Sequence, residues 1–205
     1  MVTNNSLNNT SSTFNPDELT VNSVYTFPDA DGTAGDILYA ETGTDVSWQE
    51  NISEENLVQN VFASTTSLVS STTGLPYARD TIPQNTEGDE ILTATITPKS
   101  STNKLLIQFS CSFAVSSVTA VSGALFQDST ANALSASIFQ IADGANYTGS
   151  GIITHIMDAG TTSSTTFKIR VGSTMAPTVY VNGNSTGRKF GGVASTHLII
   201  QEYKS

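Results

Sequence analysis

Charged residues are scarce in this 205-residue chain, of which only 13% is Asp, Glu, Lys or Arg. Basic residues are the scarcest, with 8 Lys and Arg against 18 Asp and Glu, so the formal net charge is −10. Phosphate groups repel such a chain, and we therefore expect neither nucleic acid nor an anionic membrane surface as a partner. Ser, Thr, Asn and 15 glycines take the place of the missing charges. This composition favours strands joined by many turns.

Cysteine and histidine are also rare. Cys111 is the single cysteine and has no partner for an internal disulfide. Its position in the alternating run "KLLIQFSCSF" predicts a buried hydrophobic side chain. His155 and His197 each lie inside a strand-like run, which favours a structural role over that of a catalytic base. The motifs HExxH and CxxC are absent, and the GxSxG match "GNSTG" at residues 183–187 lies in a glycine-rich loop without a strand–turn–helix context. We therefore predict that the protein is not an enzyme and holds no cofactor.

Long apolar runs are missing as well. No run approaches the length of a membrane span, and no apolar segment of a secretion signal follows Met1. We therefore expect synthesis in a cytoplasm and no insertion into a membrane.

The first 56 residues contain few groups that can form a core. Residues 1–20 are polar and aperiodic, which predicts an arm that is disordered or extended on its own. Three short apolar runs follow, "VNSVYTFP", "GDILYA" and "TDVSWQ", separated by turn-forming residues. A sheet this small is marginal in water, so its large side chains need a partner surface. These side chains are Tyr25, Phe27, Ile37, Leu38, Val46 and Trp48.

The turn "DADGTAGD" brings Asp29, Asp31 and Asp36 together, and carboxylates are the ligands that calcium prefers. The spacing differs from that of an EF-hand loop, because Gly32 comes too early and the twelfth position is Ala40. We interpret the segment as an Asp/Gly turn without a metal, and a bound calcium ion is the alternative.

Strand patterns dominate the remainder of the chain. "SEENLVQNVFAS" begins like a helix at Ser53, but its β-branched residues favour strands, which we predict over 57–63 and 67–72. After Gly74, alternating runs such as "ILTATITP", "KLLIQFSCSF" and "STHLIIQEY" recur between turn-forming segments. The pattern predicts an all-β fold, a jelly-roll-like β-sandwich without a helix after residue 74.

Several long phrases in residues 57–205 resemble a known module. "LPYARDTIPQNTEGDEILTATITPKSSTNKLLIQ", "MDAGTTSSTTFKIRVG" and "GRKFGGVASTHLIIQEY" resemble the β-rich head domain of tail fibres and other virion appendages of bacteriophages and large environmental viruses. "PDADGTAGDIL" resembles a fibre segment that leads into such a head. The chain has one such unit, without a long repeating shaft.

The resemblance implies three parts. Residues 21–56 would form a short intertwined β stalk, residues 57–205 a β-sandwich head, and residues 1–20 an arm that docks on other virion proteins. Three copies around a threefold axis would supply the core that a single stalk lacks, so a homotrimer is expected. The stalk residues expected at this axis are Tyr25, Phe27, Ile37, Leu38 and Trp48.

The resemblance also implies a role in the virion. The leading hypothesis is a structural protein of the particle surface, a short trimeric fibre or spike whose head decorates the particle and binds a molecule of the host surface, either glycan or protein. One alternative is a capsid-associated cementing protein that binds neighbouring capsid subunits. Another is a glycan hydrolase acting at the cell surface.

Two loops are candidates for receptor binding, because binding residues concentrate on loops far from a stalk. "ADGANYTGS" contains Tyr147, and "VNGNSTGRKF" contains Asn182, Asn184 and Arg188. An aromatic ring can stack on a sugar while amides bond its hydroxyl groups, and the acidic net charge favours neutral sugars. The alternative is that both loops are only solvated turns.

Overall fold

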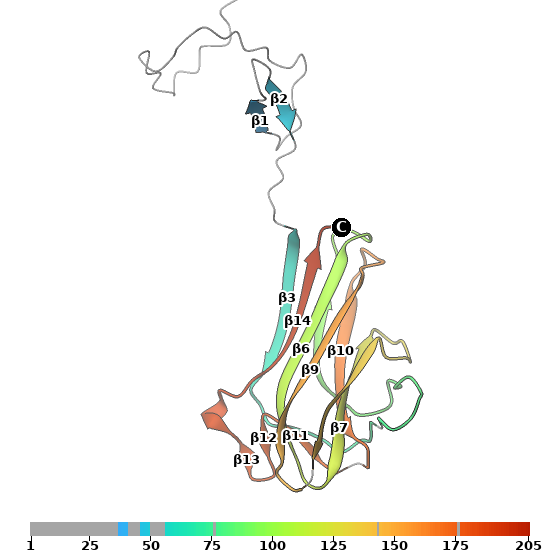
Figure 1. Cartoon of the computed structure of the whole chain (residues 1–205), viewed down its shortest axis with the longest axis vertical. Coiled ribbons are helices and arrows are strands. Elements are labelled where there is room, and N and C mark those ends of the chain that lie inside the picture. The colour runs from blue at the N-terminus through green and yellow to red at the C-terminus, as the bar shows by residue number, and fades with distance from the viewer. Residues whose placement is uncertain (1–36, 41–45, 50–55, 76, 143, 176) are drawn as a thin grey trace, which may run out of the picture. The chain divides into compact units, whose positions relative to one another are not determined.

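The computed structural model describes residues 37–40, 46–49, 56–75, 77–142, 144–175 and 177–205 (Figure 1). The chain divides into two compact units, residues 1–54 and 55–205. In the first unit, β1 (Ile37–Ala40) and β2 (Val46–Gln49) form a two-stranded antiparallel sheet in which Leu38 is opposite Trp48. Two of the three strand predictions for this region are thus confirmed. The run "VNSVYTFP", with Tyr25 and Phe27, and the arm 1–20 lie outside the described residues. The division into arm, stalk and head stays a prediction.

The second unit consists of strands joined by turns. β3 confirms the strand predicted over 57–63, and β4 lies within the one predicted over 67–72. Among the described residues after Gly74, the only helical segment is the short 3-10 turn η1 (Phe190–Gly192). The strands are β3 (Leu57–Thr65), β4 (Val69–Ser71), β5 (Asp89–Ile96), β6 (Lys104–Val115), β7 (Thr119–Gln127), β8 (Ser135–Ala142), β9 (Thr148–Asp158), β10 (Thr165–Ser173), β11 (Val179–Val181), β12 (Gly183–Asn184), β13 (Gly187–Arg188) and β14 (Thr196–Tyr203).

Two antiparallel sheets pack face to face, so the predicted β-sandwich is confirmed. One sheet has the order β5-β10-β7-β8, and the other has the order β3-β14-β6-β11-β4 with β9 on the free side of β6. β3 and β4 together act as one interrupted strand, and so do β11 and β14. If each interrupted strand is counted once, the two sheets contain eight strands in chain order. The sheet with β6 then has the order first–eighth–third–sixth, and the sheet with β10 has the order second–seventh–fourth–fifth. This order, which two Greek keys generate, supports the finer prediction of a jelly roll.

The core lies between the sheets and is centred on β6. Leu105, Ile107, Phe109, Cys111 and Phe113 alternate along this strand, and each is at most 5% exposed. They pack against buried side chains from both sheets. The period of two along the sequence therefore becomes an inner apolar face, as predicted.

The ring of Phe139 fills space beside two glycines of the interior. Phe139 of β8 packs near Phe109 and Phe113, with ring centroids 6.2 and 6.0 Å apart. A Cβ atom at Gly123 of β7 would lie 2.2 Å from this ring, and one at Gly151 of β9 would lie 2.3 Å from it. Both positions therefore require glycine to let the ring approach the backbone.

Glu202 of β14 has a fully buried carboxylate at the end of the sandwich where β3 begins. It accepts hydrogen bonds from the backbone N–H of Lys99 (2.8 Å) and Ser100 (3.2 Å), from Nδ2 of Asn103 (2.6 Å) and from Nε2 of Gln59. Burial raises the pKa of this carboxyl, but the four donors outweigh burial and hold the pKa below its ordinary value. Glu202 thereby fixes the turn between β5 and β6 to β14 and β3.

Replacement of Glu202 by Gln is expected to lower the free energy of unfolding by about 2–3 kcal/mol at neutral pH, because the buried amide would turn N–H groups toward donors. The control Glu90→Gln changes an exposed carboxylate of β5 and should shift stability by less than about 0.5 kcal/mol. The stabilisation from Glu202 is present above the ordinary glutamate pKa and is lost as pH falls through the lowered value. Urea denaturation at neutral and acidic pH measures both effects. Equal stability of wild type and Glu202→Gln at neutral pH would contradict this role.

Candidate functional site

The two loops singled out in the sequence lie side by side in the second unit. Residues 144–147 belong to the connection from β8 to β9, and residues 182–195 join β11 to β14. The Oγ atom of Ser185 donates a hydrogen bond to Oδ1 of Asn146 at 3.0 Å, which ties one loop to the other. We call this region the loop end. It lies at the opposite end of the sandwich from Leu57, the first residue of β3 (Figure 1).

Asn182 is buried under the loop end, so its predicted place on an exposed binding surface is wrong. It is 0% exposed. Its Nδ2 donates to the backbone oxygens of Thr65 (3.0 Å) and Ser67 (3.1 Å), and its Oδ1 accepts from Oγ1 of Thr196 (3.0 Å). Its φ of 63° lies in the left-handed region, which Asn tolerates better than most residues. Both amide hydrogens serve the fold, and the residue holds the insertion against the end of β3.

The other three predicted residues lie at the loop end. Tyr147 is 46% exposed, Arg188 is exposed, and Asn184 is half-buried. The Oδ1 atom of Asn184 accepts hydrogen bonds from the backbone N–H (3.0 Å) and Oγ1 (2.8 Å) of Thr186, and these bonds shape the turn between β12 and β13. Its amide nitrogen is the part left for a ligand. A receptor-binding role of these three residues stays a prediction.

An open groove of about 500 Å³ runs across the loop end. Its walls come from the end of β6, the first residues of β9 and the 182–195 insertion, with the buried Asn182 beneath. Thr148, Ser150, Asn184 and Lys189 supply polar groups, and Phe190 supplies an apolar wall. None of the lining residues is a carboxylate, histidine or cysteine. The groove therefore offers hydrogen bonds and one aromatic ring rather than a pair of acid–base groups.

The tip of the insertion is apolar, exposed and strained. Phe190 is 79% exposed and has a φ of 52°, a left-handed conformation that costs a bulky residue about 1–2 kcal/mol. Val193 beside it is 80% exposed. A Cβ atom at Gly192 would lie 2.6 Å from the guanidinium of Arg188, so the arginine packs across this glycine. Phe190 and Val193 were not predicted as site residues, although "KFGGV" places two apolar residues inside a glycine-rich loop.

Charge is unevenly divided along the chain. Residues 56–205 contain all 8 basic residues and 8 of the 18 acidic ones, so their net charge is zero and residues 1–55 carry the entire −10. Arg188 and Lys189 lie together at the loop end. The repulsion inferred from the whole-chain charge therefore does not apply there, and the argument for neutral over acidic sugars loses its basis.

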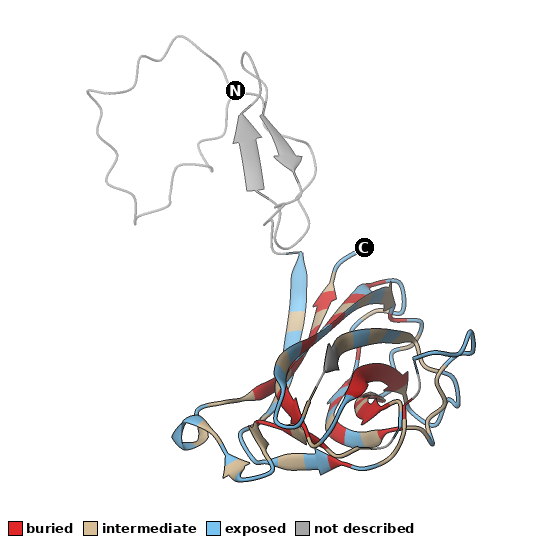
Figure 2. Cartoon of the chain, turned by 60° about the horizontal axis from the view of Figure 1, so that its bottom comes forward, coloured by how far each residue is buried: buried red, intermediate tan, exposed pale blue. Residues whose placement is uncertain are grey.

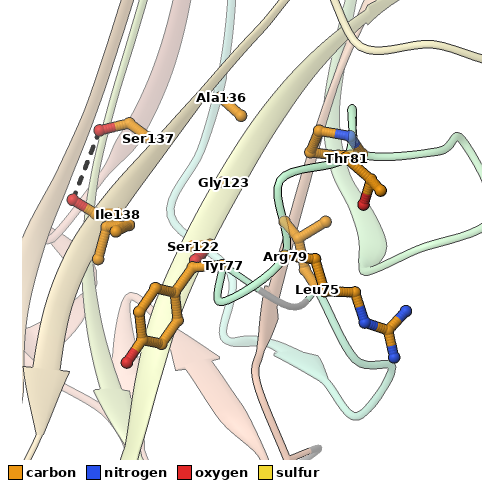
Figure 3. Close-up of a pocket in the computed structure, with 10 residues that line it drawn as sticks. Leu75, Tyr77, Arg79, Thr81, Ser122, Gly123, Ala136, Ser137 and Ile138 are labelled. Atoms are coloured by element: carbon orange, nitrogen blue, oxygen red, sulfur yellow. Dashed lines mark hydrogen bonds between the residues drawn. The ribbon is translucent and has the colours of Figure 1, made fainter.

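A second, smaller pocket lies on the outer side of β7 and β8 under the connection from β4 to β5 (Figure 3). It encloses about 170 Å³ between Leu75, Tyr77 and Arg79 of the connection and Ser122 and Ile138 of the strands. The hydroxyl of Ser122 is buried and makes no hydrogen bond among the described residues. Space of this size suits a few water molecules or one small polar group.

Groups that perform acid–base or metal chemistry are dispersed. Among the described residues, no group of three or more His, Cys, Asp and Glu side chains could hold one metal ion. The same part of the chain has no helix with the length and apolar character needed to cross a membrane. Cys111 is buried, which confirms its predicted role as a buried hydrophobic residue. Burial raises the pKa of its thiol to about 12. Burial lowers the pKa of His155. Asp29, Asp31 and Asp36 lie outside the described residues.

Asn182 and Asn184 form a matched pair for testing the loop end. Asn182→Ala is expected to lower the free energy of unfolding by about 2–4 kcal/mol, because it leaves buried carbonyl groups unpaired and puts a Cβ-bearing residue with no polar side chain at positive φ. Asn182→Gly, which relieves the backbone, should recover about 1 kcal/mol of this loss. Asn184→Ala should cost less than about 1 kcal/mol. Thermal and urea denaturation measure all three, and equal losses for the Asn182 and Asn184 alanine variants would refute the assignment.

No family model and no curated protein matches the chain. Among solved structures, one similar chain belongs to the structure of the infectious bursal disease virus Gt strain, with 12% identity, coverage of 82% of this chain and 43% of that one, and a TM-score of 0.33. A chain of the infectious bursal disease virus VP2 subviral particle is 11% identical, with coverage of 82% of this chain and 43% of that one and a TM-score of 0.34. The enzymatically active domain of tailspike protein 4 of bacteriophage CBA120 is 15% identical, with coverage of 64% of this chain and 19% of that one and a TM-score of 0.26. The chain thus spans less than half of each, and at these scores the likenesses assign it to no family.

Proposed function

We propose that the chain is a non-enzymatic structural protein of a virion, a short homotrimeric fibre or spike whose head decorates the particle surface and binds a molecule of the host surface. The observation that carries this proposal is the separation of two features of the second unit, the point where the chain enters and the groove. The chain enters the sandwich at Leu57, the first residue of β3, and β12 and β13 lie at the opposite end (Figure 1). The groove is lined by residues of that end. A head attached through residues 1–56 would thus have its groove free for a ligand.

The resemblance of residues 57–205 to virion appendage heads supports the same reading, and so does the all-β sandwich. Residues 1–20 would dock on another virion protein, and residues 21–56 would hold three copies together through Tyr25, Phe27, Ile37, Leu38 and Trp48. The β1–β2 sheet has two strands, and an isolated sheet of this size is marginal in water. Association around a threefold axis offers the missing partner surface.

The loop end suits a glycan or a small protein surface. Tyr147 and Phe190 offer rings that can stack on a sugar, while Asn184 and Lys189 offer N–H donors for hydroxyl or acidic groups. Strain at Phe190 fits such a role, because strained residues cluster at binding sites.

A cementing protein of the capsid is the second candidate, favoured by the exposed apolar Phe190 and Val193, which a neighbouring subunit could cover. The position of the chain on the particle separates the two candidates. A surface glycan hydrolase is a third possibility, and an activity screen on host polysaccharides would test it.

The homotrimer predicts a mass in light scattering of three times 21.5 kDa for the full-length protein. The stalk would form the strongest contact, because an isolated two-stranded sheet is marginal in water. A mass of one chain across the accessible concentrations would refute the homotrimer.

Attachment is expected to depend on the loop end. The double variant Tyr147→Ala/Phe190→Ala should weaken binding of the full-length protein to host cells roughly tenfold or more, as loss of central aromatic residues does at many interfaces. Tyr77→Ala is the control, because Tyr77 is 40% exposed, close to the 46% of Tyr147, but lies in the connection between β4 and β5. Binding by the double variant that equals binding by the control, with both correctly folded, would exclude the loop end as the receptor site.

A further inference from the structure

The outer face of the sheet that contains β3, β14, β6 and β9 presents several large apolar side chains to solvent among polar ones. Phe62 of β3 is 70% exposed, and Ile152 and Ile156 of β9 are 63% and 65% exposed. Half-buried Ile199 lies opposite Phe62, and half-buried Leu106 lies opposite Ile156, so all five side chains share this face. We call these five residues the outer apolar face. β3, the strand that follows the grey trace, is largely pale blue in Figure 2.

The corresponding surface of β5 and β10 in the other sheet is polar. Thr93 and Thr95 of β5 are exposed, and their neighbours across the strand boundary are Lys168 and Thr166 of β10. Polar residues are expected on a sheet face that meets water. The outer surface of β5 and β10 follows this expectation, although Ile138 on β8 of the same sheet is 51% exposed. The outer apolar face departs from it through three exposed apolar side chains on β3 and β9.

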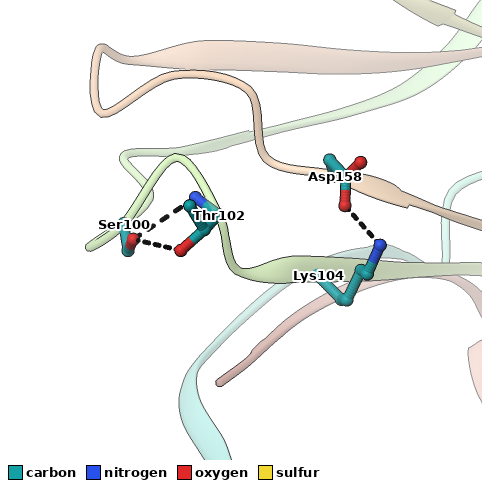
Figure 4. Close-up of polar contacts among 4 residues, drawn as sticks. All are labelled: Ser100, Thr102, Lys104 and Asp158. Atoms are coloured by element: carbon teal, nitrogen blue, oxygen red, sulfur yellow. Dashed lines mark hydrogen bonds and ion pairs between the residues drawn. The ribbon is translucent and has the colours of Figure 1, made fainter. Parts of the chain in front are cut away.

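The outer apolar face has no net charge. Lys104 of β6 and Asp158 of β9 form an ion pair at one end of it (Figure 4), with side chains 51% and 66% exposed. The central rows contain amide, hydroxyl and hydrocarbon groups together with the ring of His197. A surface that meets a copy of itself has to avoid charge of one sign, because the same charges would face each other. This face fulfils that condition.

A short connection joins the proposed stalk to β3. β2 ends at Gln49 and β3 begins at Leu57, so the two points are separated by at most about 28 Å of extended chain. β3 is also an edge strand, which pairs only with β14 among the described residues. An edge strand next to a symmetry axis is shielded from uncontrolled pairing with other chains.

We propose that the outer apolar face is the surface through which the heads of neighbouring copies contact one another in the homotrimer. The inference rests on the proposed trimer and adds the contact surface of the head. An open hollow of about 190 Å³ between Ile152, His197 and Ile199 offers a place for a large side chain of the next copy. Such knob-and-hole contacts are typical of anchors at protein interfaces.

The size of the face determines how strong the contact is. Four strands spaced about 4.8 Å apart and about seven residues of 3.4 Å each give a face of roughly 450 Å² per copy. Each partner of a standard stable interface contributes about 800 Å². The head contact therefore supplements the stalk and does not hold the trimer by itself.

Thiol labelling of the full-length protein tests the contact. Ile156→Cys is compared with the control Thr93→Cys, since both positions are exposed within one chain and the native Cys111 is buried. A bulky maleimide is expected to react at least about tenfold more slowly at position 156 than at position 93, because a neighbouring head covers only the former. Light scattering on the same samples gives the oligomeric mass. Equal labelling rates in a protein with trimer mass would overturn the head contact and leave the proposed trimer intact, whereas a monomer mass would overturn both.

A pair of charged variants gives an independent readout. Phe62→Lys/Ile156→Lys places like charges on every copy and should raise the concentration at which half of the trimer dissociates by about tenfold. Phe62→Thr/Ile156→Thr keeps strand-forming residues and should give a smaller rise, which guards against a folding defect. The control Thr93→Lys/Thr95→Lys should behave as the wild type. Dissociation of both face variants at the wild-type concentration would contradict the contact.

Discussion

The alternation of buried and exposed side chains along β6 is the constraint on which the rest of the second unit depends. This 12-residue strand lies between β9 on one side and β14 and β11 on the other. Its inner side chains meet those of the opposite sheet, including Phe167 and Ile169 of β10. A shift of one residue in register would move five apolar side chains to solvent. Since the single cysteine cannot form an internal disulfide, this interior is the main source of stability of the head.

Two buried polar residues fix the two ends of the sandwich. Glu202 binds the turn between β5 and β6 at the end where the chain enters, and Asn182 binds the 182–195 insertion at the loop end. Each satisfies backbone groups that would otherwise be buried without partners. The loop end is thus held on a rigid support, and a preformed surface loses less conformational entropy when it binds a ligand.

The sequence predicted what depends on local periodicity and missed what depends on long-range neighbours. The period-two runs around Ala94 and Cys111 identified inner faces correctly, and β-branched residues correctly favoured strands over 57–63. From the sequence alone, Asn182 cannot be distinguished from an exposed residue of a glycine-rich turn. Its hydrogen-bond partners Thr65 and Thr196 come close to it only in the folded chain. The outer apolar face was not predicted for a similar reason. Phe62 and Ile156 are far apart in the chain, and only the pairing of β3, β14, β6 and β9 puts them on one surface.

These features combine into one account, in which residues 1–56 join three copies and dock them, one sheet face brings the heads together, and the loop end meets the host. Electron cryomicroscopy of the purified full-length protein tests this account most directly. It predicts three heads around a threefold axis, with the β3–β14–β6–β9 sheets turned toward the axis and the 182–195 insertions at the end away from residues 1–55. Isolated single heads, or heads that touch through β5 and β10, would contradict it.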